Sequence, residues 1–363
     1  MKIKKAFVYI LTLFLLSPAA FAQQEQNLMS GKYTLQELQN ILIPQAQWTP
    51  FPRIDDREGW ASADRKMMDE YIKNAETYLD FNWQTITATM SLLFIRTGNR
   101  GTYEAVSFQK RKVLGTLLLA EIAENKGRFV DQIINGVWSI CEESWWGSPA
   151  HLPKREITGG LADVSNPFVD LFAAATGALL SWVDYFLGDS LDIISTHIRK
   201  RIYYEVNHRL MEPLMNQRFW WMGKKTNGRG PNNWNTWICS NWINSVLLLE
   251  KDDVRRATMI GKALQVLDEF INPYPHDGGC DEGPGIGTLL PRRFTTMFRC
   301  SISPVETLSV MCTTTNGSVT WDVLFFERKS AKSTFSILPM QDQGYMYRLQ
   351  WFTDTEKTLK TRI

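Results

Sequence analysis

VLGTLLLAEIAENKGRFVDQIINGVW, residues 113–138, contains two apolar stripes separated by a polar turn around Gly127. The apolar side chains recur every three or four residues, which is the spacing of a helix with one buried face. The stripes comprise Val113, Leu117, Ala120, Ile122 and Ala123 before the turn, and Val130, Ile133, Ile134, Val137 and Trp138 after it. This stretch therefore predicts two helices joined by a short connection.

The same spacing extends over most of residues 64–272. It predicts further helices at 167–187, 191–216, 234–250 and 253–272, and Asp253 suits a helix N-terminus because it is acidic. Glycine and proline interrupt the pattern at 147–149, 159–160, 188 and 228–231. Long helices with short polar connections favour antiparallel pairs, so the sequence predicts a mostly α fold, an α/α solenoid or toroid.

The N-terminus has the features of an export signal. Lys2, Lys4 and Lys5 precede an apolar run at 6–16, and Ala20-Phe21-Ala22 gives the small–x–small pattern of a cleavage site. We expect residues 1–22 to be a signal peptide cleaved after Ala22, and the mature protein to be periplasmic or secreted. The run is shorter than the ~20 residues of a spanning helix, so no stable membrane insertion is expected after cleavage; an uncleaved anchor is the alternative.

Charge and cysteine content narrow the classes of partner. The formal charge is +2 for the whole chain and falls to −1 without the three lysines of residues 1–22. A nucleic-acid binder usually carries a basic excess, so no nucleic acid is expected as a partner. The five cysteines have no CxxC spacing, which argues against a metal knot, and no cofactor is expected. An oxidising compartment permits a disulfide, but its connectivity stays open.

Fourteen tryptophans, several in clusters, distinguish this chain. Flat indole rings complement sugar rings, and they also fill helical cores, so both interpretations stay open. Asn233, Trp237, Asn241 and Asn244 are three or four residues apart and therefore share one helix face. Such a stripe suits a polar cavity whose amides bind sugar oxygens or carboxylates. The alternative is that these amides are caps or satisfy buried backbone, and Asn232 or Asn233 is a candidate N-cap.

Two further segments carry polar candidates. Residues 272–285, NPYPHDGGCDEGPG, combine turn residues with His276, Asp281 and Glu282, and residues 141–153, CEESWWGSPAHLP, place His151 after a tryptophan pair. Loops hold functional side chains more often than helices do, although single acids or histidines in turns are commonly structural. The chain has no GxSxG, HExxH or Walker A motif.

In these three segments the chain resembles the heparinase II/III-like polysaccharide lyases, over roughly residues 30–285. The motifs that carry the resemblance are 142–153, Asn232-Asn233-Trp234-Asn235 and 277–285, in this order. The resemblance implies an α/α toroid followed by a β-sandwich, and β-elimination on an acidic polysaccharide or oligosaccharide that contains uronic acid. Asn233 would neutralise the substrate carboxylate, His151 would bind or transfer a proton, and Glu282 would orient the loop or substrate. The implied substrate-binding residues are Asn232, Trp145, Trp146, Trp234, Trp237, Asn241 and His276.

The chain departs from this family after Gly285, where Ile286 stands in place of the expected tyrosine. The helical spacing also stops there. We therefore expect an incomplete α/α toroid at 64–285, preceded by an extended or short-helix segment at 23–63. Residues 286–363 are expected to be a short irregular or disordered tail. One hypothesis is a frameshifted tail and an inactive copy, and the alternative is a short variant with a small β-rich cap.

Two other functions are compatible with the sequence. An α/α-barrel glycoside hydrolase would use Asp281 or Glu282 with Glu142 or Glu143, since hydrolysis needs two carboxylates about 5–10 Å apart. A non-catalytic glycan-binding protein would keep the groove of amides and aromatic rings without turnover.

Overall fold

The computed structural model describes residues 27–153, 159–223 and 232–273, together with five strand segments between residues 300 and 353. Its helical part begins with α2 (Leu35–Ile41), the short 3₁₀ helices η1 (Gln45–Gln47) and η2 (Gly59–Ser62), α3 (Arg65–Glu76) and α4 (Ala88–Thr97). Three long pairs follow: α5 (Gly101–Glu124) with α6 (Val130–Cys141), α8 (Leu171–Ile194) with α9 (Thr196–Val206), and α11 (Asn233–Leu249) with α12 (Asp253–Ile271). The prediction of a mostly helical fold is confirmed.

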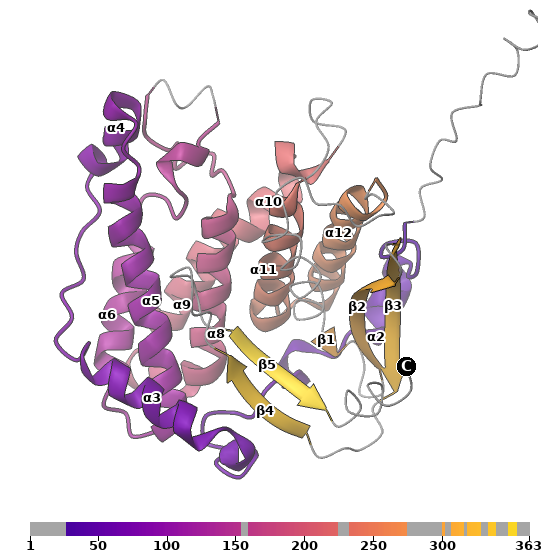
Figure 1. Ribbon diagram of the computed structural model, residues 1–363, viewed down its shortest axis with the longest axis horizontal. Coiled ribbons are helices and arrows are strands. Elements are labelled where there is room, and N and C mark those ends of the chain that lie inside the picture. The colour runs from indigo at the N-terminus through magenta and orange to yellow at the C-terminus, as the bar shows by residue number, and fades with distance from the viewer. Residues whose placement is uncertain are drawn as a thin grey trace, which may run out of the picture.

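The three pairs stand side by side in Figure 1, and within each pair the two helices pack together. α8 packs against α5 and α11, so the first helices of the three pairs form one layer, and α6 also packs against α9. The first helices are buried almost all round, as expected for the inner layer. The closed ring that the family resemblance implies stays a prediction.

α8 is the centre of the helical core. It is long and apolar enough to cross a membrane by length and composition, yet 83% of its apolar window is buried within the protein. Gly188 was expected to end this helix, but α8 continues to Ile194. The reason is that the guanidinium of Arg199 from α9 lies directly against Gly188 and forms ion pairs with Asp184 and Asp192 of α8. The small side chain therefore permits a close helix contact instead of a break.

The N-terminal segment belongs to the same core. Met29, Leu38, Trp48 and Trp60 are all buried in it. Backbone N–H groups of Met29 and Ser30 donate to the Asp268 carboxylate of α12 at 2.9 and 2.7 Å. Within residues 27–63, Met29 and Gln45 contact α12 and α11, whereas Arg53 and Arg57 donate to carbonyls of α8 and α5. The predicted signal peptide lies outside the described residues.

The described parts of the C-terminal tail form strands; an irregular tail and a small β-rich cap were both left open by the sequence. β1 (Cys300–Ser301), β2 (Glu306–Thr315) and β3 (Ser318–Glu327) form one antiparallel sheet, and β4 (Ser333–Leu338) pairs antiparallel with β5 (Arg348–Thr353). The β2–β3 register runs from Glu306 opposite Glu327 to Thr315 opposite Ser318. Both strands are rich in β-branched or aromatic residues, which favour strands over irregular chain.

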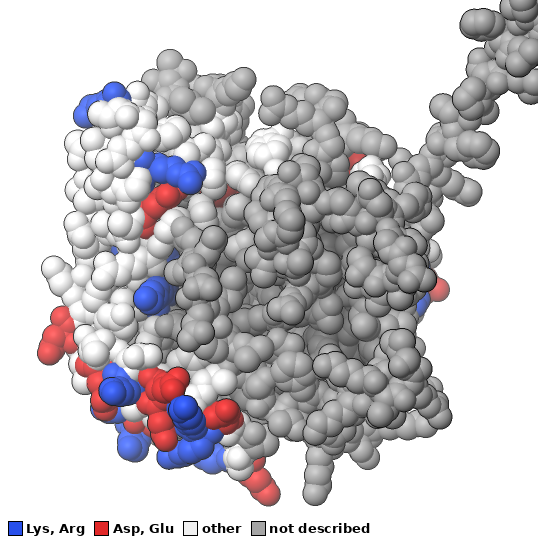
Figure 2. All heavy atoms as spheres, viewed as in Figure 1, with Lys and Arg blue, Asp and Glu red and all other residues white. Residues whose placement is uncertain are grey.

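The charged surface on the face shown in Figure 2 is mixed in sign. Basic and acidic side chains gather together over α3, where Arg65 pairs with Asp69 at 3.4 Å. Isolated surface pairs of this kind contribute only about 0–1 kcal/mol to stability.

Candidate functional site

His151 is positioned by a short 3₁₀ turn, η3 (Pro149–His151), between α6 and α8. The Ser148 hydroxyl accepts from the Ala150 N–H, and the His151 N–H donates to the Ser148 carbonyl at 2.8 Å. The proline at the first position preorganises the turn, because its φ angle is already fixed near the helical value. The imidazole thus projects from a constrained turn and is 14% exposed.

Asp170, the N-cap of α8, holds the histidine ring. Its side chain is fully buried, and Oδ2 lies 2.7 Å from Nδ1 of His151. Oδ2 also accepts from the Ser148 N–H, and Oδ1 accepts from the N–H groups of Phe172 and Ala173. Because the carboxylate accepts every one of these bonds, Nδ1 carries the hydrogen. In the neutral imidazole Nε2 is then the proton acceptor, and it has no hydrogen-bond partner among the described residues.

Aromatic rings enclose the imidazole from two sides. Phe172 of α8 stacks on it with centroids 5.3 Å apart at 12°, and Trp234 of α11 lies 4.6 Å away at 58°. Trp220 in turn packs on Trp234 at 4.9 Å. The structure therefore brings together two segments that were singled out separately in the sequence, the one ending at His151 and the one beginning at Asn232.

The two neighbouring asparagines at the start of α11 have different roles. Asn232 is the N-cap, and its Oδ1 accepts from the Trp234 N–H at 3.2 Å. Asn233 is the first helical residue, and its Oδ1 is buried with no hydrogen-bond partner among the residues that the structure describes. An unpaired buried polar atom costs about 1–3 kcal/mol, so it requires an explanation. Of these two neighbouring asparagines, Asn233 is therefore the candidate for ligand binding.

Replacing Asn232 with Ala tests this division. The loss of the cap should lower the free energy of unfolding by about 1 kcal/mol. Denaturant unfolding of the variant and the native chain measures the difference. Asn233→Ala is the matched control, because it removes no cap and should change stability less. A larger stability loss in the control would contradict the assignment.

The predicted asparagine face of α11 coincides with the less buried side of that helix. Asn233, Trp237, Asn241 and Asn244 are all partly exposed, while the residues between them are buried, apart from Trp234. Asn241 donates from Nδ2 to the Trp237 carbonyl at 2.9 Å, so its amide serves its own helix. The four residues therefore share one face of α11, as their spacing predicts. Among them, Asn233 is the strongest candidate for binding a ligand.

Trp145 and Trp146, which were predicted to bind the substrate, are both buried, and Trp145 also lines a pocket that is separate from the His151 site. Trp146 is 1% exposed, its indole N–H donates to the Ile140 carbonyl, and Arg209 lies over its ring at 4.9 Å. The Trp145 N–H donates to the Phe168 carbonyl, and the Trp145 carbonyl accepts from Tyr103. Neither ring presents a free face to the His151 site, because both are packed into the wall behind it.

Glu143 is also structural. Its carboxylate is buried and bound by Lys110 at 2.7 Å and by both terminal nitrogens of Arg111 at 2.8 and 2.5 Å. A general acid must exchange protons with substrate, and a carboxylate engaged by two buried cations does not suit that task. Glu142 is solvent-exposed and pairs with Arg201 at 3.2 Å. His276, Asp281 and Glu282 lie outside the described residues.

The described residues include no group of three His, Cys, Asp or Glu side chains that could hold a metal ion. Cys141 and Cys239 are buried free thiols. Burial raises the pKa of the Cys141 thiol to about 12 and also raises the pKa of Cys239, so neither is a nucleophile at neutral pH.

Two residues of the site were missed in the sequence, namely Asp170 and Phe172. The available signal was weak: Asp170 precedes an apolar run, which indicates an N-cap, but nothing in the spacing connects it to His151. Searches of protein-family models and of curated proteins find no match for this chain.

Proposed function

We propose that the protein is an exported polysaccharide lyase that cleaves a uronic-acid-containing glycan by β-elimination. The single observation that carries this proposal is the His151–Asp170 pair in contact with the α11 segment that holds Asn233. Export rests on the N-terminal sequence, and the substrate class rests on the family resemblance.

The chemistry needs a base, a group that stabilises negative charge and a proton donor. His151 Nε2 would remove the proton from C5 of the uronate, and the Nδ1–H bond to Asp170 would stabilise the imidazolium that forms. The C5–H electron pair then becomes the C4–C5 double bond while the C4–O4 bond breaks. The leaving oxygen O4 then takes a proton. The imidazolium supplies this proton when the C5 hydrogen and O4 lie on the same face of the sugar.

Asn233 would stabilise the charge that develops on the substrate carboxylate. Its side-chain oxygen and nitrogen exchange places when the amide rotates by half a turn, so either can occupy the unpaired position. With the nitrogen there, two N–H donors are available to the carboxylate. The indole of Trp234 beside His151 supplies an apolar wall, which excludes water and strengthens these bonds.

The hydrolase alternative has less support. Hydrolysis needs two free carboxylates, and the buried Glu143 is committed to Lys110 and Arg111. Of the other acids that were considered for it, Glu142 is exposed and pairs with Arg201, and Asp281 and Glu282 lie outside the described residues. A glycan-binding protein without turnover is distinguished by the experiment that follows.

The experiment is a screen of the purified chain against a panel of uronic-acid polymers, with product ultraviolet absorbance as the readout. Elimination creates a C4–C5 double bond conjugated with the carboxylate, and hydrolysis does not. The proposal predicts absorbance that grows with time and is lost in His151→Asn. New reducing ends without absorbance would indicate a hydrolase, and calorimetric binding without product would indicate a binding protein.

Replacing Asn233 with Ala should lower kcat by about 10²–10³-fold, the usual effect of removing one donor to a developing negative charge. KM should change less, because the interaction strengthens in the transition state. Steady-state kinetics on the responsive polymer measure both constants. Asn241→Ala is the control on the same helix face and should keep most of the rate. Full activity in Asn233→Ala would exclude it as the charge-stabilising residue.

A further inference from the structure

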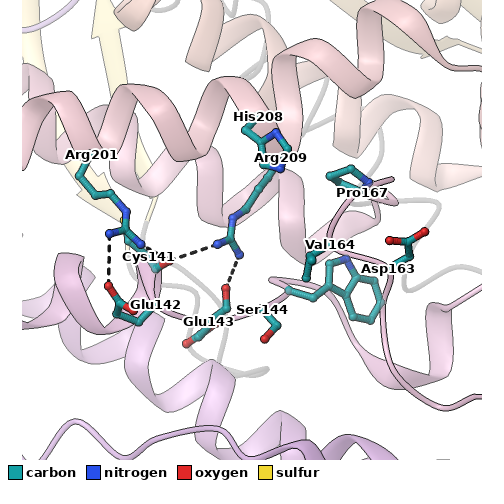
Figure 3. Close-up of a pocket in the computed structure, with 11 residues that line it drawn as sticks. Cys141, Glu142, Glu143, Ser144, Asp163, Val164, Pro167, Arg201, His208 and Arg209 are labelled. Carbon is teal, nitrogen blue, oxygen red and sulfur yellow. Dashed lines mark hydrogen bonds and ion pairs between the residues drawn. The ribbon is translucent and has the colours of Figure 1, made fainter.

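A pocket of about 170 Å³ lies between the C-terminal end of α6 and the α9–η4 helix. Figure 3 shows Arg201 and Arg209 reaching from that helix toward the turn at 141–143, with Val164 and Pro167 on the other side. Its lining also includes Glu142, Asp163 and His208. The side chain of Glu142 is 58% exposed and Val164 is 56% exposed, so the mouth opens to solvent.

One wall of this pocket is built on a π-helical turn, η4 (Asn207–Met211), which continues α9 into α10 (Glu212–Asn216). His208 and Arg209 both belong to this turn and both line the pocket. π-helical turns are uncommon, and they occur frequently at functional sites because the extra residue redirects side chains. The irregular turn therefore coincides with the pocket.

The two arginines are fixed before any ligand arrives. Both donate to the Cys141 carbonyl at 3.1 Å, and both bind Glu205, Arg201 at 2.8 Å and Arg209 at 2.5 Å. Arg209 also donates to the Glu143 carbonyl. Each guanidinium has five N–H donors. Arg201 uses three of them, on the Cys141 carbonyl, Glu205 and Glu142. Arg209 also uses three, on the carbonyls of Cys141 and Glu143 and on Glu205. Their remaining donors have defined positions, which lowers the entropic cost of binding a ligand.

The lining identifies the chemistry of the ligand. Glu142 and Asp163 offer hydrogen-bond acceptors, the arginines offer donors, and Trp145, Val164 and Pro167 are apolar. An anion would meet the two carboxylates and be repelled, whereas a cation would meet the two guanidinium groups. Neutral hydroxyl groups both donate and accept, so they suit this mixture. The volume is below the ~300–1,000 Å³ of most drug-sized sites, which restricts the ligand to about one ring.

This pocket is separate from the His151 site, although the two share a wall. A Cβ atom at Gly147 would lie 2.3 Å from the Trp145 ring and 2.7 Å from Oδ2 of Asp170. The Trp145 ring therefore lies against the backbone beside Asp170 and also lines the pocket between α6 and the α9–η4 helix. Occupation of this pocket does not require His151, and none of its lining residues enters the proposed elimination.

We propose that this pocket binds one neutral sugar ring through its hydroxyl groups, as a site distinct from that of the proposed lyase activity. Glu142 accepts from ring hydroxyls, the free N–H groups of Arg201 and Arg209 donate to them, and Val164 contacts the apolar face of the ring. The site takes its ligand whether or not the protein is a lyase.

The test is titration of the full chain with glucose, galactose and N-acetylglucosamine, followed by calorimetry and by saturation-transfer NMR. At least one neutral sugar is expected to bind, and glucuronate at least tenfold more weakly than that sugar. Val164→Trp fills the pocket and should abolish binding. Val254→Trp is the matched control, since Val254 is equally exposed but lies on α12, and it should bind as the native chain does.

A second pair of variants tests the hydrogen bonds. Glu142→Gln should raise the Kd at least about tenfold, because bonds to a charged acceptor are the stronger ones. Glu212→Gln removes a similar exposed carboxylate that pairs with Arg255, and it should leave the Kd unchanged. His151→Asn should also leave it unchanged, which separates this site from the proposed lyase site. Absence of binding by all three neutral sugars, tighter binding of glucuronate, or equal binding by Val164→Trp and Val254→Trp would overturn the proposal.

Discussion

Replacing Asp170 with Asn is expected to lower the proposed lyase kcat by about 10²–10⁴-fold. Asparagine still caps α8, because its oxygen accepts from the Phe172 and Ala173 N–H groups as Oδ1 does now. Its NH₂ group, however, faces Nδ1 of His151 where a carboxylate oxygen lay 2.7 Å away. The imidazole must then place its hydrogen on Nε2, and it can no longer accept the substrate proton.

The measurement is steady-state kinetics on the polymer that the native chain degrades, together with circular dichroism to verify folding. Asp252→Asn is the matched control, because Asp252 also caps its helix, α12, but contacts no histidine in the part of the chain that the structure describes. It should keep full activity. If Asp170→Asn also kept full activity while folded, the histidine would not depend on its buried partner, and the role of His151 as a base would have to be abandoned.

Replacing Glu143 with Gln is expected to lower the free energy of unfolding by about 3–5 kcal/mol. The change leaves Lys110 and Arg111 buried without their counter-charge. Burial already lowers the pKa of Lys110, and Glu143 opposes that shift, so the loss of Glu143 lowers this pKa further. Both cations lie on α5 in the core, where water cannot replace the lost carboxylate.

Denaturant unfolding of the variant and the native chain measures this loss. Glu142→Gln is the adjacent control, and it should cost less than about 1 kcal/mol because its ion pair with Arg201 is exposed to solvent. A similar small cost for both variants would mean that the buried carboxylate is not needed to neutralise the two cations. Replacing all three buried charges with Met should recover part of the loss, since apolar substitutes need no counter-charge.

The helical architecture could be predicted because it depends on local spacing. α11 and α12 begin and end within one residue of the predicted ranges, since their apolar periodicity and their flanking caps agree. Gly188 was wrongly interpreted as a break, because a glycine inside a helix and a glycine at its end have the same local sequence. Only the packing of Arg199 against it distinguishes the two.

The candidate site was predictable only in part. The spacing of Asn233 and Trp237 on one face needed no tertiary information. The roles of Trp145 and Trp146 could not be separated from those of Trp234, because an indole has the same chemistry in a core and in a binding site. Trp146 is fully buried under Arg209, whereas Trp234 lies against His151.

The sequence by itself determined the helix pairs, the common face of α11 and the presence of His151 beside a turn. Tertiary structure alone decided that Asp170 holds that histidine and that Glu143 is bound between two cations. The physical reason is the sequence separation of the interacting residues. Helix periodicity and caps depend on residues three or four positions apart. The contacts that give a side chain its chemistry join segments 19 to 32 residues apart, as for His151 with Asp170 and Arg111 with Glu143.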